Sequence, residues 1–249
     1  FCGARVANKG LANRPNRYLL LTPLDQQIDQ TPIPPRDLFL SRIVPERYAH
    51  TMSEIARIRT HADRSVPEKA AEFLAAGLIA HVGIVQDGQP FVIPMIYGYD
   101  PAVPDRLYLH GSQSSRLQNF LATGAPVCVE VTTVDGLVYS RSALYHSANY
   151  RSVVCFGTAH PVADAAQKDA IFEKMITRYF AGRTPGKDYL PSSQAELDAT
   201  SMVEVRIREM SAKMRVGPPA GPNDRNPDAL GTCGVEEFVL QKKDVPAGR

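Results

Sequence analysis

The chain has 249 residues, of which 44% are hydrophobic, 22% charged and 8% aromatic. This composition is typical of a folded globular protein and excludes a chain dominated by disorder. No apolar run reaches the roughly 18 residues of a membrane-spanning helix, so no membrane partner is expected. The 28 basic and 26 acidic side chains are interspersed without a basic block, which argues against nucleic acid as a partner.

Neither the cysteines nor the histidines have the spacing of a metal site. The four cysteines lie far apart, without a CxxC pair, so reduced thiols in a cytoplasmic protein are expected. The six histidines show no ligand spacing on a helix, and no metal is predicted. The sequence also lacks the motifs of serine hydrolases, zinc proteases, P-loop proteins and Rossmann folds.

The sequence divides into three parts. Residues 1–51 are rich in proline and lack a sustained helical or strand period, which predicts an irregular N-terminal extension. Up to Leu24 this part carries basic side chains and no acidic one, which is compatible with an organelle-targeting leader, although a cytoplasmic location is favoured. Residues 52–219 form the predicted domain, and residues 220–249 an extended C-terminal tail.

Local signals place helices and hairpins along the domain. Ser65–Glu68 combines an N-cap hydroxyl with a proline tolerated in the first helical turn. Asp87-Gly88 and Asp135-Gly136 each favour the positive φ values of a tight hairpin turn, and Asp164 caps a longer helix. In chain order, the predicted elements are a helix at 65–77, strands at 79–85, 89–97 and 106–110, a helix at 115–122, strands at 126–134, 137–143 and 152–162, helices at 164–180 and around Glu196, and a strand at 202–209.

These six to seven strands are joined mainly by hairpins, with helices inserted between them. Such an order predicts a mainly β fold with α decoration, built as a closed antiparallel barrel.

The most informative local feature is the loop after the strand at 106–110. His110 ends that strand and is followed by Gly111, by several serines and by Arg116 at the start of a helix. Free backbone N–H groups, hydroxyls and a guanidinium group there would suit a phosphate. The alternative is that Ser115 only caps the helix.

Two polar stretches adjoin apolar strands, at residues 146–152 and 211–215. Both could reach the same pocket, or both could be solvated turns. His81 opens a strand, where a histidine with a structural role is more common than a catalytic one.

Several ordered blocks between Arg59 and Pro219 resemble the FMN-binding split-barrel superfamily, which includes the pyridoxamine 5'-phosphate oxidases. The resemblance is strongest to the flavin-nucleotide-binding branch related to nitroimidazole-resistance proteins. The blocks that carry it are residues 59–64, HVGIVQDGQPFVIPMIY, LYLHGSQSSRL, VDGLVYSRSALYHSANYRSVVCFGTA and SAKMRVGPP. The resemblance implies a six- to seven-stranded antiparallel split barrel that binds FMN.

The resemblance also assigns residues to the cofactor site. In this family one strand flanks the flavin ring, a loop holds the ribityl chain and the phosphate, and a later strand contributes to the site. Carried over in that order, these residues are Pro94, Met95, Ile96 and Tyr97 for the ring, His110 and Gly111 for the ribityl chain, Ser115 and Arg116 for the phosphate, and Arg151 and Ser152 on the later strand.

Some positions depart from the vitamin B6 oxidases within this superfamily. Those enzymes have a lysine directly after the loop arginine, where this chain has Leu117, and a C-terminal tryptophan, whereas this chain has none. The related branch ends in a Trp-Ala-Gly-Val-like block, where this chain reads Ala229–Val235. The resemblance therefore does not extend to vitamin B6 oxidation.

The resemblance implies an FMN-dependent oxidoreductase that acts on a small, nitroaromatic-type substrate and forms a homodimer. His110 is the candidate catalytic residue, because an imidazole can donate a proton near neutral pH; the alternative is that it only bonds the ribityl chain. Two other functions stay open: a non-catalytic protein that binds flavin or haem on the same barrel, and an interaction module with an empty barrel.

Overall fold

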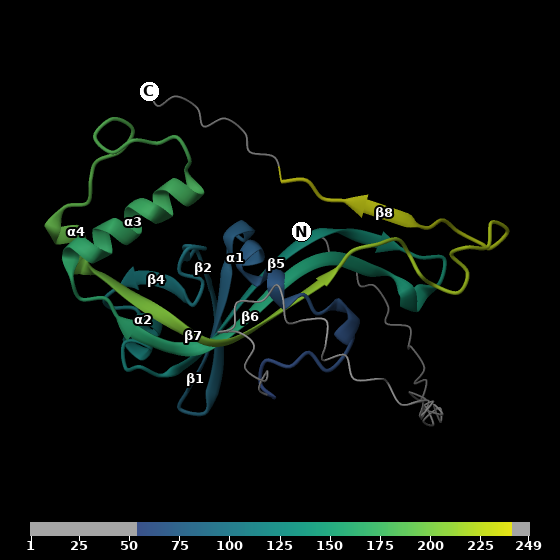
Figure 1. The fold of residues 1–249 in the computed structure, drawn as a ribbon, viewed down its shortest axis with the longest axis horizontal. Helices are drawn as coiled ribbons and strands as arrows, with labels where there is room; N and C mark the ends of the chain where they lie inside the picture. Colours follow the sequence, from purple (N-terminus) through teal and green to yellow (C-terminus); the bar gives the residue numbers. More distant parts are fainter. Residues whose placement is uncertain (1–53, 241–249) are drawn as a thin grey trace, which may run out of the picture. The chain divides into compact units, whose positions relative to one another are not determined.

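The computed structural model describes residues 54–240 (Figure 1), so the predicted extension at 1–51 lies outside the described residues. The strands are β1 (Ala80–Gln86), β2 (Gln89–Met95), β3 (Gly98–Tyr99), β4 (Arg106–Ser112), β5 (Pro126–Tyr139), β6 (Ser147–Pro161), β7 (Thr200–Arg215) and β8 (Gly234–Glu237). The α-helices are α1 (Ala70–Ala76), α2 (Arg116–Leu121), α3 (Ala165–Tyr179) and α4 (Gln194–Ala199). Short 3-10 turns lie at Ala62–Arg64, Pro67–Lys69 and Ala143–Tyr145.

The strands form one antiparallel sheet in the order β2-β1-β5-β6-β7-β4-β3, and β8 pairs with β5 beside this path. The prediction of a mainly β fold with α decoration is confirmed. Figure 1 shows β5 and β6 running beyond the other strands, with β8 alongside β5. We call residues 132–152, the outer parts of β5 and β6 with the turn between them, the arm.

The barrel is not closed. The closed barrel predicted from the strand order is therefore wrong, and the split barrel implied by the family resemblance is confirmed. No ladder joins β2 to β3 or β4 among residues 54–240. The reason lies at Tyr97, just after β2, whose backbone is bonded to α3 instead of to a strand. Its N–H donates to the Tyr179 hydroxyl at 3.2 Å, and its carbonyl accepts from Arg178 at 2.7 Å.

The core lies on the inner face of the curved sheet, where α1 and α2 pack. Strict alternation along β5 buries Val127, Val129 and Val131 against Leu107 and Leu109 of β4. A smaller cluster on the outer face packs α3 over β4 and the start of β7. Each sheet residue therefore faces either the inner core or the outer surface, and this parity decides where a candidate residue points.

The predicted hairpin around Asp135-Gly136 is wrong. β5 continues through this dipeptide to Tyr139, with a bulge between Val134 and Gly136. Gly136 is required there for a different reason: β8 pairs alongside it, and a Cβ would collide with the Glu236 carbonyl oxygen. An Asp-Gly pair can therefore indicate a close approach of two backbones as well as a turn.

β7 is longer than the strand predicted at 202–209, because the polar stretch at 211–215 is part of β7 and does not follow it as a loop. This stretch pairs with the other polar stretch on β6, with Ser152 opposite Lys213 and Tyr150 opposite Arg215. The two stretches thus lie side by side in the sheet, and the interpretation that both reach one pocket stays a prediction.

The helix predicted at 65–77 is a 3-10 turn followed by α1, and Ser65 caps neither of them. The remaining predicted elements are present with shifted ends. The turn at Asp87-Gly88 has φ values of 53° and 77°, as a two-residue hairpin requires. Within residues 54–240, no helix is long and apolar enough to cross a membrane, and no three His, Cys, Asp or Glu side chains gather as metal ligands would. The tail after Pro218 includes β8, and the domain boundaries at 52 and 219 stay a prediction.

Candidate functional site

β2 is an edge strand, paired only with β1 among the described residues. The two-residue turn at Asp87-Gly88 closes the hairpin on a hydrogen-bonded pair. Every second residue from there, Pro90, Val92 and Pro94, therefore directs its backbone groups away from β1, toward the free edge. Prolines at these positions cost the β1–β2 ladder no hydrogen bond. The free edge presents mainly carbonyl groups and the N–H of Val92.

The side chains of the four residues predicted to flank the flavin ring point alternately to the outer and the inner face of the sheet. Pro94 and Ile96 are exposed on the outer face, whereas Met95 packs against the inner core. Tyr97 is fully buried, and its hydroxyl donates to the Leu74 carbonyl. Burial raises the pKa of Tyr97 to about 12, although the nearby Arg178 opposes this. The side chain of Tyr97 therefore belongs to the core.

The loop before α2 brings a cation to β2. Ser115 donates its N–H to the Ser112 carbonyl at 2.9 Å, and its hydroxyl caps α2 by accepting from the Gln118 N–H at 3.5 Å. Arg116 is the first residue of α2, and its guanidinium carbon lies 4.2 Å from the centre of the Phe91 ring on β2. Ser115 thus does cap the helix, and Arg116 lies beside the edge strand.

His110 and Gly111 face opposite sides of β4. The His110 ring lies under α3, edge-to-face with Phe172 at a centroid distance of 4.9 Å. Its Nδ1 is buried without a hydrogen-bond partner, and burial lowers the pKa of this imidazole. Gly111 faces α2, where a Cβ would lie 3.2 Å from Gln118 Cγ. The catalytic role of His110 stays a prediction.

Arg151 and Ser152 are neighbours on β6 and therefore also face opposite sides. Arg151 makes a bidentate ion pair with Asp135, at 2.7 Å for the closest atoms, and lies 5.8 Å from the Phe73 ring centre. Its hydrogen bonds to Asp135 raise the pKa of this arginine. Ser152 is on the outer face, opposite Thr132 of β5. Arg151 is thus already paired within the protein.

A histidine–carboxylate pair lies on the outer face beside β2. His81 Nδ1 is 3.1 Å from Glu130 Oε2, and the Thr132 hydroxyl donates to the other carboxylate oxygen of Glu130. In the β1–β2 register, His81 stands directly opposite Pro94. Sequence reasoning missed this pair, since it depends on β1 pairing with β5, which no local motif encodes.

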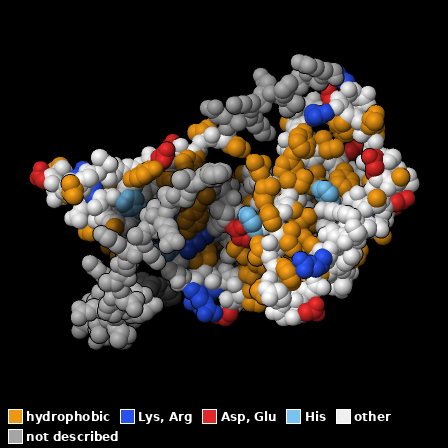
Figure 2. Space-filling view, turned by 180° about the vertical axis from the view of Figure 1, so that it is seen from behind, with side chains coloured by type: hydrophobic (Ala, Val, Ile, Leu, Met, Phe, Trp, Pro, Cys, Tyr) orange, Lys and Arg blue, Asp and Glu red, His pale blue; other side chains and the backbone are white. Residues whose placement is uncertain are grey.

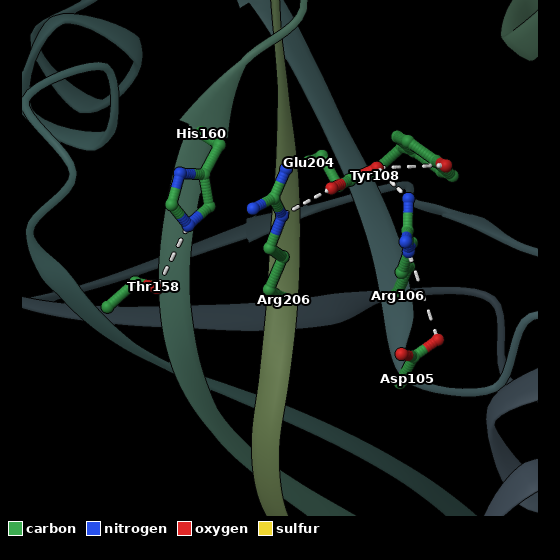
Figure 3. A network of polar contacts seen from close by, with 7 residues as sticks. All are labelled: Asp105, Arg106, Tyr108, Thr158, His160, Glu204 and Arg206. Carbon is green, nitrogen blue, oxygen red and sulfur yellow. Dashed lines mark hydrogen bonds and ion pairs between the residues drawn. The ribbon is translucent and has the colours of Figure 1, made fainter.

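A second polar cluster lies further round the outer face (Figure 3). The buried Glu204 carboxylate accepts from Arg106 at 3.0 Å and from Arg206 at 2.8 Å, with the Tyr108 hydroxyl at 3.4 Å. Burial alone would raise the pKa of Glu204, but the two arginines outweigh it and lower that pKa. None of the predicted site residues takes part in this cluster.

Two cavities among the described residues contain no predicted site residue in their walls. One, of about 230 Å³, lies between α3 and β3, with Asp100, Tyr108 and Lys174 in its wall. The other, of about 220 Å³, adjoins α2, with Lys168 and Asn119 in its wall. The buried Lys168 ammonium donates to the Leu197 and Thr200 carbonyls at the end of α4.

The structure thus brings together part of the predicted site. The serine loop and Arg116 are neighbours of β2 through the ring of Phe91, which points to the inner face, opposite to Val92 and Pro94. The His110 ring, the Tyr97 side chain and Arg151 are each occupied by contacts elsewhere in the fold.

Comparison with known proteins agrees with this architecture. A family model described as pyridoxamine 5'-phosphate oxidase matches residues 67–214. No curated protein matches the chain. The flavocytochrome Anf3 from Azotobacter vinelandii is 29% identical, with a TM-score of 0.67, over 79% of this chain and 91% of its own.

A second solved structure, the FAD and haem binding protein from Mycobacterium smegmatis, is similar over an almost equal length. It is 32% identical to this chain, with a TM-score of 0.63, over 74% of this chain and 92% of its own. The family match covers more than half of the sequence and runs from before β1 to Met214 in β7. The chain belongs to the pyridoxamine 5'-phosphate oxidase family.

Proposed function

We propose that this chain is a flavin-binding redox protein whose flavin lies along the free edge of β2, with its phosphate at Arg116. The observation that carries this proposal is the contact between Arg116 and Phe91 of β2. It puts a permanent positive charge beside a strand edge whose backbone groups have no strand partner among the described residues.

The residues present fit a flavin. Val92 is 68% exposed and Pro94 is exposed beside it, so this strand offers an apolar strip to a flat ring. The Val92 N–H and the carbonyls at the free edge suit the polar edge of an isoalloxazine. Arg116 is suited to a phosphate, because a guanidinium binds phosphate oxygens through two parallel hydrogen bonds.

A bound flavin would supply transfer of one or two electrons. The part of this chain is to orient the ring, to bond its polar edge and to exclude water from one face. We propose that a small aromatic or nitroaromatic substrate reacts at the other face, which makes the protein an oxidoreductase.

FMN is the proposed cofactor because the serine loop and Arg116 form a seat for one terminal phosphate. The two similar structures are named for FAD and haem or for a flavocytochrome. FAD contains the FMN group, so the same seat would serve its inner phosphate. The names of these two structures also favour a second candidate function, in which this chain carries haem beside the flavin.

The visible spectrum of the purified protein tests these proposals. Flavin bands, and a released compound with the mass of FMN, are the expected result. A released compound with the mass of FAD would support flavin binding but show that the cofactor is FAD and not FMN. A Soret band would show that the protein also binds haem. A colourless protein that does not quench the fluorescence of added FMN or FAD would refute flavin binding.

A further inference from the structure

The outer face around His81 combines an apolar surface with one fixed polar group. Figure 2 shows hydrophobic side chains gathered in a broad area on one face of the molecule. The β1–β2 register puts His81 opposite Pro94 and Gly83 opposite Val92, and the β1–β5 register puts Glu130 on the other side of His81. Side chains that stand opposite each other on antiparallel strands share a face.

His81 and Pro94 form a pair without backbone hydrogen bonds, the kind in which side chains approach most closely. The His81 imidazole is therefore the first polar group next to the exposed strip of β2. Its side chain is 45% exposed, and that of Glu130 is 31% exposed. The imidazole is thus accessible to a molecule that lies over Pro94.

Glu130 fixes the orientation of this imidazole. One carboxylate oxygen accepts from Thr132 and the other is 3.1 Å from His81 Nδ1. A carboxylate at Nδ1 holds the proton on that nitrogen, turns the ring to one direction and leaves Nε2 for a ligand. No hydrogen bond of Nε2 is recorded within the described residues.

Cys128 is the other titratable side chain that the register brings to this part of the face, opposite Gly83. Burial, with the Glu130 carboxylate as a smaller cause, raises the pKa of the Cys128 thiol, which keeps it neutral. The neighbours from β2, Val92 and Pro94, carry no charge. Glu130 is therefore the charged partner of His81.

We propose that His81, oriented by Glu130, contacts the bound ligand and that its Nε2 accepts a hydrogen bond from the ring N–H at the polar edge of the flavin. This inference rests on the proposed flavin binding and gives a role to His81, a residue to which the family resemblance assigns none and which the predicted site does not include. Glu130 acts through His81 and is a positioning residue.

Riboflavin is the probe, because it has the ring but no phosphate and so reports on His81 separately from Arg116. The protein is freed of flavin, and riboflavin affinity is measured by fluorescence quenching for the wild type, His81→Leu, His81→Gln and Glu130→Gln. His160→Leu is the matched control, since His160 bonds Thr158 on β6, away from β2. Independently, the His81 ring nitrogens of the wild type are followed by NMR during the titration.

His81→Leu should weaken riboflavin about tenfold, the usual effect of one hydrogen bond to a buried ligand. His81→Gln should recover part of this loss, Glu130→Gln should lose less than His81→Leu, and His160→Leu should bind as the wild type does. The NMR signal of His81 Nε2 should shift when riboflavin binds.

Two results would overturn the inference while flavin binding stands: equal affinity of His81→Leu and wild type, or His81 nitrogen signals that do not move in the saturated protein. The NMR result decides even if the variants fail to fold. Failure of the wild type to bind riboflavin, FMN and FAD would overturn the proposed function together with this inference.

Discussion

At the scale of single residues, Arg116 is proposed to bind the phosphate of FMN and not the flavin ring, so its substitution should affect FMN and riboflavin differently. Its guanidinium is 4.2 Å from the Phe91 ring centre and makes no ion pair among those recorded in residues 54–240. Arg116→Ala should therefore weaken FMN by about ten- to a hundredfold, since hydrogen bonds to charged groups contribute about 1.5–3 kcal/mol. Riboflavin, which lacks the phosphate, should bind almost unchanged.

Isothermal titration of the flavin-free protein with both ligands measures this difference. Arg183→Ala is a suitable control, because Arg183 lies after α3 and contacts Tyr189 instead of β2. Equal losses of FMN and riboflavin in Arg116→Ala would show that Arg116 does not hold the phosphate.

Tyr97 gives a prediction about stability at high pH. Burial raises the folded-state pKa of Tyr97 to about 12, from the value of 10.0 that is usual for a tyrosine. The folded state therefore favours the protonated phenol, a contribution that is complete below pH 10 and is lost as the pH rises through about 12. Tyr97→Phe should cost about 1–2 kcal/mol at pH 8, through loss of the hydrogen bond to Leu74.

Urea unfolding of both proteins between pH 8 and pH 12 checks this prediction. The free energy of unfolding of the wild type should fall more steeply above pH 10 than that of Tyr97→Phe, so the two curves approach each other. Parallel curves would mean that the Tyr97 phenol ionises in the folded protein as easily as in the unfolded chain.

Much of the candidate site could be predicted at residue scale, but the direction of its side chains could not. The positions of β2, the serine loop and the helix that begins at Arg116 could be predicted from the sequence, because local turn and capping residues fix these elements. Strand parity turns the side chains of Met95 and Arg151 inward, a direction that the sequence did not indicate, and their part in the site stays a prediction. The His81–Glu130 pair depends on contact between positions 49 apart in sequence, beyond any local motif.

At the scale of elements, two identical Asp-Gly dipeptides adopt different secondary structures. Asp87-Gly88 is a two-residue turn with positive φ at both positions, whereas Asp135-Gly136 continues a strand through a bulge. The difference comes from β8, which follows about a hundred residues later and needs a glycine beside its backbone. The first hairpin and the caps at Ser115 and Asp164 could be predicted because their causes are local. The cap predicted at Ser65 is not formed, and the length of β5 could not be predicted from local residues.

This difference gives a prediction for Gly136→Ala. The new Cβ would collide with the Glu236 carbonyl oxygen, so β8 should separate from β5 while the rest of the sheet keeps its ladder. Limited proteolysis should then cleave the chain around residues 234–240 faster than in the wild type. Gly234→Ala is the matched control, because a Cβ on Gly234 meets no atom within 4 Å.

Faster cleavage of Gly136→Ala with a small loss in melting temperature is the expected result, since a detached edge strand exposes little core. Equal cleavage of the two variants and the wild type would mean that the pairing of β8 tolerates a side chain at Gly136.

At the scale of the whole molecule, the arm exposes a set of large apolar side chains that the described residues leave uncovered. Leu144 in its turn is 96% exposed, and Tyr139 and Tyr145 are 42% and 49% exposed. Val134 and Leu137 on β5 are 46% and 40% exposed. Apolar groups gathered on one element are typical of an interface.

We propose that this arm forms the interface of the homodimer that the family resemblance implies. Leu144→Arg should weaken the dimer at least tenfold, because it puts a charge into an apolar contact. Leu190→Arg is the matched control: Leu190 is 89% exposed but lies before α4, away from the arm. Neither substitution removes a core contact, so both proteins should melt like the wild type if measured as monomers.

Sedimentation velocity over a range of micromolar concentrations measures the dimer, and it should be run with and without flavin. A dimeric wild type, a dimeric Leu190→Arg and a largely monomeric Leu144→Arg are expected. A monomeric wild type with flavin bound would show that one chain completes the site alone. A dimeric Leu144→Arg with unchanged affinity would instead place the interface elsewhere on the sheet, because a buried arginine at position 144 would be too costly for a contact that included the turn of the arm.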